Sequence, residues 1–154
     1  MIVCFVRHGK AEEKKPGQSD EERRLTEEGR HDVELVSKML PVARGAKVYT
    51  SPLVRARESA EIIARVLGGS IEILEALRPN TASLKALESI EISSDAVFVG
   101  HAPSLENIVS DLIGGGAIKL KAGGAACVDI GDERRLKRGV GVLVLLVQPQ
   151  YIKK

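Results

Sequence analysis

The chain has 154 residues, with 23 lysines and arginines against 21 aspartates and glutamates, and its formal net charge at pH 7 is +2. So small a net charge does not indicate a polyanionic partner, and an aromatic content of 3% leaves little surface on which unpaired bases could stack. We therefore expect no nucleic acid partner. A chain of this length fits one domain over residues 1–154, large enough to bury a core without a stabilising metal or disulfide.

No apolar run in the sequence reaches the roughly 20 residues that a membrane span needs, so we expect no membrane partner. The N-terminal residues lack the length and the basic flank of a signal peptide. The two cysteines, Cys4 and Cys127, lie in apolar segments without CxxC spacing. We interpret them as small core residues with free thiols rather than as a disulfide, which predicts a reducing, cytoplasmic compartment.

The first part of the chain alternates predicted strands with a charged loop and a helix. Residues 2–6 are rich in Val, Ile and Phe without polar alternation, which is typical of a strand buried on both faces. Residues 10–23 are densely charged and contain a proline and a glycine; we interpret them as a solvated connector, with a loop overhanging a site as the alternative. Thr26 is a predicted N-cap for an amphipathic helix that ends at Pro41, and residues 47–50 form a second predicted strand.

The remaining strands and helices follow from the same two patterns. Further strands are predicted where apolar and β-branched residues run together, at residues 71–74, 96–99, 125–130 and 140–147. Further helices are predicted where a Ser, Thr or Pro precedes an apolar stripe, at residues 51–67, from Thr81 or Ser83 to residue 90, and at residues 103–114. The last two strands flank a predicted hairpin turn. Strands that alternate with helices and end in a hairpin predict an α/β fold, a three-layer α/β/α sandwich whose mostly parallel central sheet has an antiparallel edge.

Two histidines each follow a predicted strand: His8, preceded by Arg7, follows the first strand, and His101 follows the fourth. Because ligands bind outside the carboxyl ends of parallel strands, both imidazoles can lie in one crevice. Arg55 lies one turn into a helix that begins at a strand end, so it can point into the same crevice. Arginine donors match phosphate oxygens, and a histidine among cations stays neutral with a lone pair for attack. These residues predict a phosphoryl-transfer site without a metal, with His8 or His101 as the nucleophile.

Other kinds of site find less support in the sequence. The histidines at positions 8, 31 and 101 lack the HxH and HExxH spacings of metal sites, and arginines crowd the first and last, so we expect no metal. His31 is interpreted as a residue on the flank of its helix. No GxGxxG follows the first strand, which argues against a dinucleotide-binding domain, and no cofactor is implied.

Four segments, in order along the chain, resemble motifs of the histidine phosphatase superfamily, the RHG branch. They are Arg7-His8-Gly9, RRLTEEGR at residues 23–30 beside the family's RPLTxxGR, SPLVRA at residues 51–56 beside SPLxRA, and VGHAPSLE at residues 99–106 beside VGHNPxLE. The short length and this set of motifs are similar to the SixA-like phosphohistidine phosphatases. The resemblance implies a phosphoglycerate mutase-like fold and a hydrolase, a phosphatase that needs no cofactor.

The resemblance also implies a role for each site residue. His8 is the nucleophile and becomes a covalent phosphohistidine intermediate, which water then hydrolyses. The remaining catalytic residues hold the phosphoryl oxygens: Arg7, Arg55 and His101. Substrate binding extends from these to Gly9 and to the backbone of Ala102. The implied partner is a protein carrying phosphohistidine or a small phosphorylated molecule.

The chain departs from the family pattern at three places. Arg24 stands where the family often has proline, and Ala102 replaces an asparagine, so that only the backbone of that residue can contact substrate. Residues 77–80 read Leu-Arg-Pro-Asn and lack the Glu or Asp that family members cleaving alkyl phosphates use as a proton donor. Since imidazole leaves with weaker acid assistance than an alkoxide, this absence favours phosphohistidine as the substrate. A displaced acid, Glu12 or Glu75, is the alternative.

Two other functions stay open at this point. A phosphatase of small phosphate esters or anhydrides would use the same histidines and arginines, with the loop at residues 10–23 selecting the substrate. A non-catalytic binder of phosphorylated partners would keep the pocket without turnover, although such a binder has no use for a nucleophile. A mutase is not expected, because returning the phosphoryl group to a hydroxyl also needs an efficient acid or base.

Overall fold

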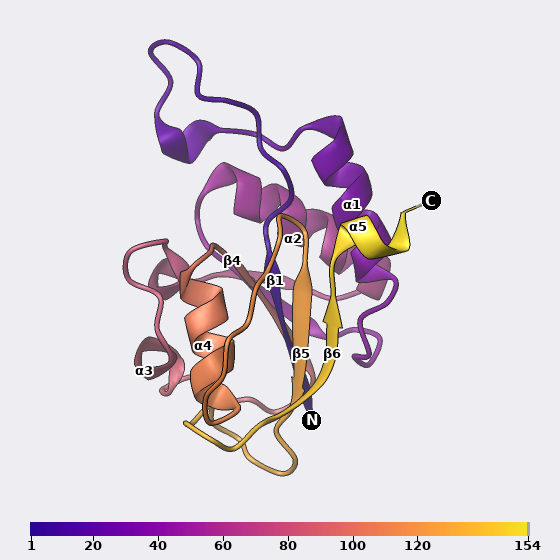
Figure 1. Ribbon diagram of the computed structural model, residues 1–154, viewed down its shortest axis with the longest axis vertical. Helices are drawn as coiled ribbons and strands as arrows, with labels where there is room; N and C mark the ends of the chain where they lie inside the picture. The colour runs from indigo at the N-terminus through magenta and orange to yellow at the C-terminus, as the bar shows by residue number, and fades with distance from the viewer. Residues whose placement is uncertain (154) are drawn as a thin grey trace.

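The computed structural model describes residues 1–153, and a mixed sheet of six strands forms its centre (Figure 1). The strands, in chain order, are β1 (Ile2–Arg7), β2 (Lys47–Thr50), β3 (Ile71–Ile73), β4 (Ala96–Gly100), β5 (Ala125–Asp129) and β6 (Val142–Val147). Their order across the sheet is β3-β2-β4-β1-β5-β6. The strands β1 to β4 pair in parallel, whereas β5 runs antiparallel to both β1 and β6. The predicted, mostly parallel sheet with an antiparallel edge is therefore confirmed.

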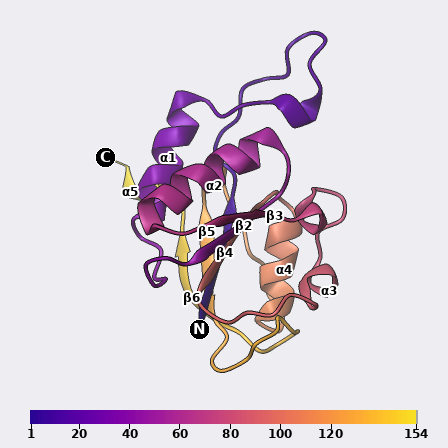
Figure 2. The same cartoon turned by 180° about the vertical axis from the view of Figure 1, so that it is seen from behind.

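Helices cover both faces of the sheet, as Figures 1 and 2 show from opposite sides. They are α1 (Glu27–Ser37), α2 (Val54–Leu67), α3 (Leu84–Leu87), α4 (Ser104–Leu112) and α5 (Pro149–Ile152), with two 3₁₀ helices, η1 (Asp20–Glu22) and η2 (Glu75–Leu77). The helices α1 and α2 pack on one face and α3 and α4 on the other, so the predicted three-layer sandwich is confirmed. Within residues 1–153, none of these helices combines enough length with enough apolar character to span a bilayer.

The core consists of two apolar clusters, one on each face of the sheet, because side chains along a strand alternate between its faces. In β1, Val3 and Phe5 face the side of α3 and α4, and Cys4 and Val6 face the side of α1 and α2, with exposures of at most 1%. Phe5 stacks on Phe98 of β4, with ring centroids 5.4 Å apart. The strand β1 is thus buried on both faces, as its lack of polar alternation predicts.

Element boundaries differ from the prediction at a few places. Helix α2 begins at Val54 and not at Ser51, because the Ser51 hydroxyl accepts a hydrogen bond from the Leu53 N–H, 3.2 Å away, in a turn that precedes the helix. Helix α3 ends at Leu87 rather than at residue 90. The short helix α5 has no counterpart in the prediction.

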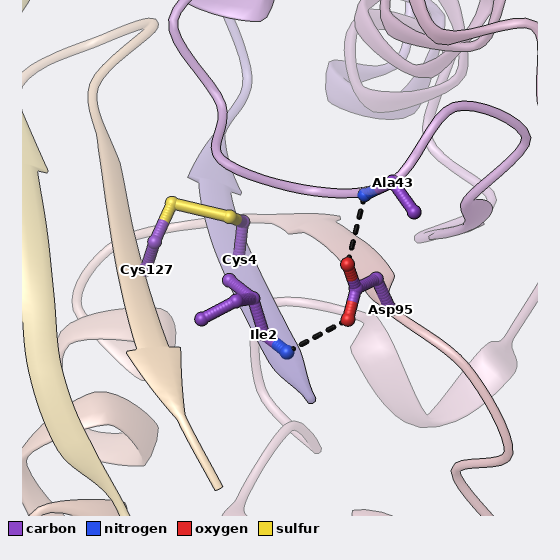
Figure 3. The surroundings of a disulfide bond; sticks show 5 residues. All are labelled: Ile2, Cys4, Ala43, Asp95 and Cys127. Atoms are coloured by element: carbon purple, nitrogen blue, oxygen red, sulfur yellow. Dashed lines mark hydrogen bonds between the residues drawn. A yellow bond between two sulfur atoms is a disulfide. The ribbon is translucent and has the colours of Figure 1, made fainter. Parts of the chain in front are cut away.

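The two cysteines form a disulfide between β1 and β5, so the prediction of free thiols is wrong (Figure 3). The antiparallel register places Cys4 directly opposite Cys127, with their Cα atoms 4.0 Å apart across a sequence separation of 123 residues. The sequence pattern indicates which residues lie in strands but not the register between two distant strands, and this pairing depends on the register. The disulfide removes the support that free thiols gave to a reducing compartment.

The topology brings the ends of three parallel strands to one edge of the sheet. The strand β4 lies between β2 and β1, and the register pairs Arg7 with Gly100 and Thr50 with Val99. The residues that follow these strands emerge at the same edge: His8, Ser51 and His101. Because the strands are parallel and in register, this edge is where side chains from separate segments can form one site.

Candidate active site

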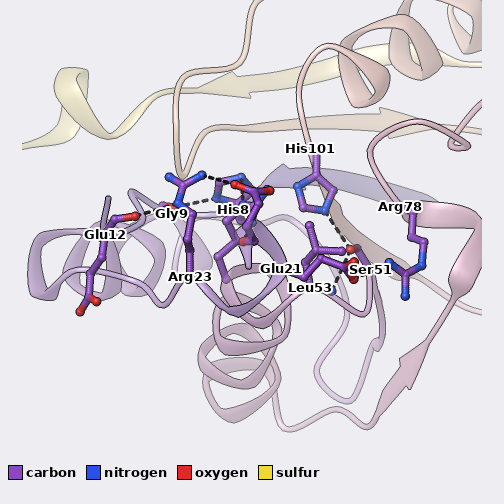
Figure 4. A network of polar contacts seen from close by, with 11 residues as sticks. His8, Gly9, Glu12, Glu21, Arg23, Ser51, Leu53, Arg78 and His101 are labelled. Carbon is purple, nitrogen blue, oxygen red and sulfur yellow. Dashed lines mark hydrogen bonds and ion pairs between the residues drawn. The ribbon is translucent and has the colours of Figure 1, made fainter. Parts of the chain in front are cut away.

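The residues predicted to act together lie at this edge of the sheet. Arg7 ends β1 and His8 follows it, His101 follows β4, and Arg55 is the second residue of α2. The His8 N–H donates to the Gly100 carbonyl at 3.0 Å, which anchors the end of β1 against β4. The rings of His8 and His101 lie side by side, with centroids 5.1 Å apart and planes tilted by 59° (Figure 4). The structure thus brings the two histidines into one place.

His8 is held as a neutral imidazole. Its Nδ1 lies 2.7 Å from the Gly9 carbonyl oxygen, which can only accept, so Nδ1 carries the proton. The lone pair of Nε2 then accepts from Arg55 Nε at 3.3 Å. Burial, the largest effect, and three nearby guanidinium groups lower the pKa of His8 to about 4, although the Gly9 carbonyl acts to raise it. His8 is therefore neutral at neutral pH, the state that a nucleophile needs.

His101 is 3% exposed, and its ring forms a hydrogen bond through one of its two nitrogens. Its Nε2 lies 2.8 Å from Ser51 Oγ, whereas its buried Nδ1 has no hydrogen-bond partner within residues 1–153. Burial, followed by the proximity of His8 and Arg55, lowers the pKa of His101 to about 3. His101 is therefore also neutral, with its unused nitrogen on the side of the ring toward His8 (Figure 4).

The two arginines differ in which of their donors are free. Arg7 Nη1 donates to the Leu120 carbonyl at 2.8 Å, and its buried Nε has no partner in the part of the chain that the structure describes. The Arg55 side chain is 7% exposed, and its Nε reaches the nearby imidazole. Its Nη1 and Nη2 donate to the backbone carbonyl and the carboxylate of Asp20, at 2.9 and 3.1 Å. Buried polar groups normally have partners, so the unused Arg7 Nε and His101 Nδ1 suit a bound anion with several acceptor oxygens.

An acidic residue lies against the arginines of the site. Asp20 begins η1, and its carboxylate lies 3.0 Å from Arg23 Nη1 and 3.1 Å from Arg55 Nη2. The hydrogen bond from Arg23 is the main cause that lowers the pKa of Asp20, against the raising effect of partial burial. The η1 end of the loop at residues 10–23 therefore lies against the site, and the prediction of a merely solvated connector is wrong for this end, whereas residues 13–17 are exposed as predicted. The charged run indicates an exposed loop but carries no signal for which carboxylate turns inward.

A buried carboxylate that sequence reasoning missed fixes the helix behind the site. Glu58 lies one turn after Arg55 on α2 and accepts hydrogen bonds from the Leu25 N–H at 2.8 Å, Arg24 Nη2 at 2.9 Å and Arg30 Nη2 at 2.7 Å. Burial acts to raise its pKa, but these hydrogen bonds outweigh burial and hold the pKa below its usual value. Glu58 ties α2, which carries Arg55, to the segment with the RRLTEEGR motif. The three-residue spacing between Arg55 and Glu58, which places them one turn apart on a predicted helix, is the sequence signal that could have indicated Glu58.

The two other residues expected to bind substrate lie beside the histidines. The Gly9 N–H donates to Ser59 Oγ at 3.0 Å, and its carbonyl accepts from His8, so Gly9 acts on the site by orienting that ring. A Cβ on Gly9 would lie 2.7 Å from a backbone oxygen of α1, so this position has no room for a larger residue. Ala102 is half-buried, directly after His101 and before α4.

Within the described residues 1–153, neither candidate for a displaced acid, Glu12 or Glu75, forms a hydrogen bond with the ring of His8 or His101. Glu12 pairs with Lys15 at 3.7 Å, and its carboxylate points away from His8 (Figure 4). Glu75 pairs with Arg78 at 2.5 Å. Within residues 1–153, no three His, Cys, Asp or Glu side chains gather in a way that would hold a metal ion. A pocket of about 410 Å³ adjoins the site, and it is lined by Asp20, Glu21, Leu53, Arg78, Pro79, Asn80 and Thr81.

The sequence is similar to those of known proteins over long stretches. Residues 3–95 match the model of the histidine phosphatase superfamily, branch 1. An uncharacterized protein of Picosynechococcus sp. is 32% identical over 163 residues, which cover 99% of this chain and 99% of that protein. A probable phosphoglycerate mutase, GpmB, of Photorhabdus laumondii is 40% identical over 82 residues, which cover 51% of this chain and 37% of that protein.

Solved structures share the fold over nearly the whole chain. The protein histidine phosphatase SixA, complexed with tungstate, has a TM-score of 0.82 at 23% identity, covering 99% of this chain and 100% of that one. A putative phosphohistidine phosphatase SixA from Agrobacterium tumefaciens has a TM-score of 0.75 at 22% identity, covering 96% of this chain and 97% of that one. At these identities the likeness establishes the fold. The family model, in turn, matches more than half of the chain, and the protein therefore belongs to branch 1 of the histidine phosphatase superfamily.

Proposed function

We propose that the protein is a metal-independent phosphatase that removes phosphate from phosphohistidine through a covalent intermediate on His8. The observation that carries this proposal is the neutral His8 imidazole, whose Nε2 lone pair lies 3.3 Å from Arg55 Nε. Such a lone pair attacks phosphorus while the surrounding donors, which include Arg7 and His101, neutralise the phosphoryl oxygens. The structural likeness to proteins named SixA phosphohistidine phosphatases supports the substrate class.

The proposed reaction consists of two displacements. In the first, His8 Nε2 bonds to phosphorus as the phosphorus–nitrogen bond of the substrate breaks, and the substrate imidazole leaves as a neutral ring when its other nitrogen carries a proton. In the second, water bonds to phosphorus, the bond to Nε2 breaks, and inorganic phosphate leaves with the protons of that water. Because the Gly9 carbonyl keeps a proton on Nδ1, His8 also departs as a neutral imidazole and is ready for the next turnover.

The acids near the site support a phosphorus–nitrogen substrate over a phosphate ester. An alkoxide leaving group needs a positioned acid, which contributes about 10²–10⁴-fold. Residues 77–80 contain no carboxyl group, and Asp20 has a pKa below its usual range because Arg23 and Arg55 hold it ionised. An ionised Asp20 has no proton to donate at neutral pH. A protonated imidazole needs no such donor, so phosphohistidine matches what the site offers.

A phosphatase of small phosphate esters or anhydrides is the second candidate, and the neighbouring pocket argues against it. Many such substrates carry a further anionic group, which would enter the pocket beside the site. Arg78 is the cation of that pocket, but Glu21 and Glu75 each pair with it at 2.5 Å. Its charge is therefore already neutralised, which is unfavourable for nucleotides and phosphoglycerates.

The proposal is tested by phosphate release in the presence of EDTA. The substrates are a protein phosphorylated on histidine, p-nitrophenyl phosphate, and a panel of sugar phosphates and nucleotides. The variants are His8→Ala and, as a matched control, His31→Ala, which removes an exposed histidine on α1 outside the site. We expect phosphohistidine to be hydrolysed fastest, His8→Ala to lose turnover, and His31→Ala to keep it.

Each other result points to a different function. Full turnover by His8→Ala would refute the assignment of the nucleophile. Faster turnover of a sugar phosphate or nucleotide than of phosphohistidine would favour the ester phosphatase. Tight binding of inorganic phosphate without hydrolysis of any substrate would identify a non-catalytic binder.

A further inference from the structure

The Ser51 hydroxyl lies behind the ring of His101, a residue 50 positions further along the chain. We propose that Ser51 is a positioning residue that keeps the single proton of the His101 ring on Nδ1, so that this nitrogen donates a hydrogen bond to a phosphoryl oxygen. The inference rests on the proposed function, because it assigns how one donor of that site is prepared. Ser51 itself acts only through His101.

The surroundings of Ser51 fix its hydroxyl in one place. The residue has an exposure of 0%, and it directly follows β2. Its N–H donates to the Val99 carbonyl at 3.1 Å, and its carbonyl accepts from the Thr50 hydroxyl at 3.0 Å. Its Oγ lies 3.2 Å from the Leu53 nitrogen and 2.8 Å from His101 Nε2 (Figure 4). The hydroxyl therefore lies between a backbone donor and an imidazole nitrogen.

A count of protons selects the tautomer of His101. A serine hydroxyl has one proton to donate and two lone pairs to accept with. The Leu53 N–H can only donate, so it takes one lone pair of Ser51 Oγ. If His101 Nε2 also carried a proton, both neighbours would donate to Oγ, and the buried hydroxyl proton would have no acceptor among the hydrogen bonds of residues 1–153. If Nε2 is unprotonated, Ser51 donates to it and every group behind the ring is satisfied.

The selected tautomer gives His101 the polarity that phosphate binding needs. Its pKa of about 3 means that the ring has one proton at neutral pH, and Ser51 assigns that proton to the buried, unpartnered Nδ1. Phosphoryl oxygens accept hydrogen bonds, so Nδ1–H attracts them, whereas a lone pair at Nδ1 would repel them. His8 has the same tautomer for the opposite purpose, since the Gly9 carbonyl holds its proton on Nδ1 and leaves a lone pair on Nε2.

The tautomer is measured directly by ¹⁵N NMR of protein labelled at histidine, with the His101 signals identified by their loss in His101→Asn. We expect the wild-type ring to show a pyrrole-type Nδ1 and a pyridine-type Nε2 at neutral pH. Ser51→Ala should give the other tautomer or a mixture of the two. Ser104→Ala is the matched control, because the Ser104 hydroxyl is also buried and bonds to His101, but to its backbone carbonyl at 3.1 Å. That variant should keep the wild-type tautomer.

The functional consequence is measured as the affinity for inorganic phosphate by calorimetry, which needs no turnover. In Ser51→Ala, the molecules with the other His101 tautomer lose the hydrogen bond from Nδ1 to the charged phosphate, so this variant should bind phosphate roughly tenfold more weakly. Ser104→Ala should bind phosphate within about twofold of the wild type. A wild-type His101 with its proton on Nε2 would overturn the inference whether or not any variant folds. An unchanged phosphate affinity in a folded Ser51→Ala would do the same. Failure to hydrolyse phosphohistidine would leave both readouts measurable, so it would count against the proposed function alone.

Discussion

Replacing Asp20 by asparagine should strengthen the binding of inorganic phosphate. In the structure the Asp20 carboxylate accepts from Arg55 Nη2 at 3.1 Å and from Arg23 Nη1 at 3.0 Å. A phosphate that binds to Arg55 must displace this carboxylate and then lie close to its negative charge. Asparagine keeps the size of the side chain and removes the charge, so the competition is weaker.

The expected magnitude follows from how exposed the two ion pairs are. The Asp20 side chain is 57% exposed, so each pair belongs to the class that contributes about 0.2–1 kcal/mol. Together they are worth about 1 kcal/mol, which corresponds to a roughly fivefold lower Kd for phosphate. The gain is limited because the Asp20 backbone carbonyl still accepts from Arg55 Nη1 at 2.9 Å in the variant.

The assay is isothermal titration calorimetry of inorganic phosphate at low ionic strength, where surface charges are least screened. The matched control is Glu13→Gln, which removes one negative charge from the same loop at an exposed position. We expect Asp20→Asn to bind phosphate more tightly than the wild type and Glu13→Gln to match the wild type. An equal or weaker affinity of Asp20→Asn would show that Asp20 does not compete with phosphate, and equal gains in both variants would show a general charge effect.

Three further predictions concern pH, the disulfide and the buried carboxylate. Burial lowers the pKa of His8 to about 4 and of His101 to about 3, from an unfolded value of 6.5, so the unfolded chain takes up protons that the folded chain excludes as the pH falls. The free energy of unfolding should therefore decrease by about 2 kcal/mol per histidine between pH 8 and pH 5 in urea titrations, and a variant without both histidines should lose this dependence. The intact mass of the protein should be two hydrogens lower without reductant than with it, because Cys4 and Cys127 are joined, and equal masses would contradict the disulfide. Cys127→Ala should lower the free energy of unfolding by about 4–5 kcal/mol, because the disulfide closes a loop of 123 residues. Glu58→Gln should lower stability by about 1–3 kcal/mol and reduce turnover, since two arginines and a backbone N–H lose a charged acceptor; unchanged melting would refute its anchoring role.

The parts of the site that lie directly after strands could be predicted from the sequence. His8 and His101 follow buried apolar runs, and parallel strands bring such positions to a common edge whatever their separation in sequence. Arg55 could be predicted for the same reason, because its helix begins one short turn after the end of β2. Burial on both faces of β1 was equally predictable, since the strand has no polar alternation.

The parts that depend on register or on one side chain's direction could not be predicted. The disulfide requires Cys4 and Cys127 to be opposite each other in an antiparallel pair, and no local pattern sets that register. Ser51 is of a residue type that often caps a helix, but its hydroxyl contacts the imidazole of His101, which follows β4. Asp20 is one of several carboxylates in a charged run, and only the path of the loop selects it.

The central claim is that phosphate passes through a covalent bond to His8. It is tested most directly by mixing the enzyme with a phosphohistidine protein, quenching in alkali, where phosphohistidine is stable, and locating the phosphate by mass spectrometry of peptides. We expect phosphate on His8 that appears at least as fast as turnover and that is absent from His8→Ala. Turnover with no phosphate on His8, or phosphate on His101 in its place, would contradict the mechanism.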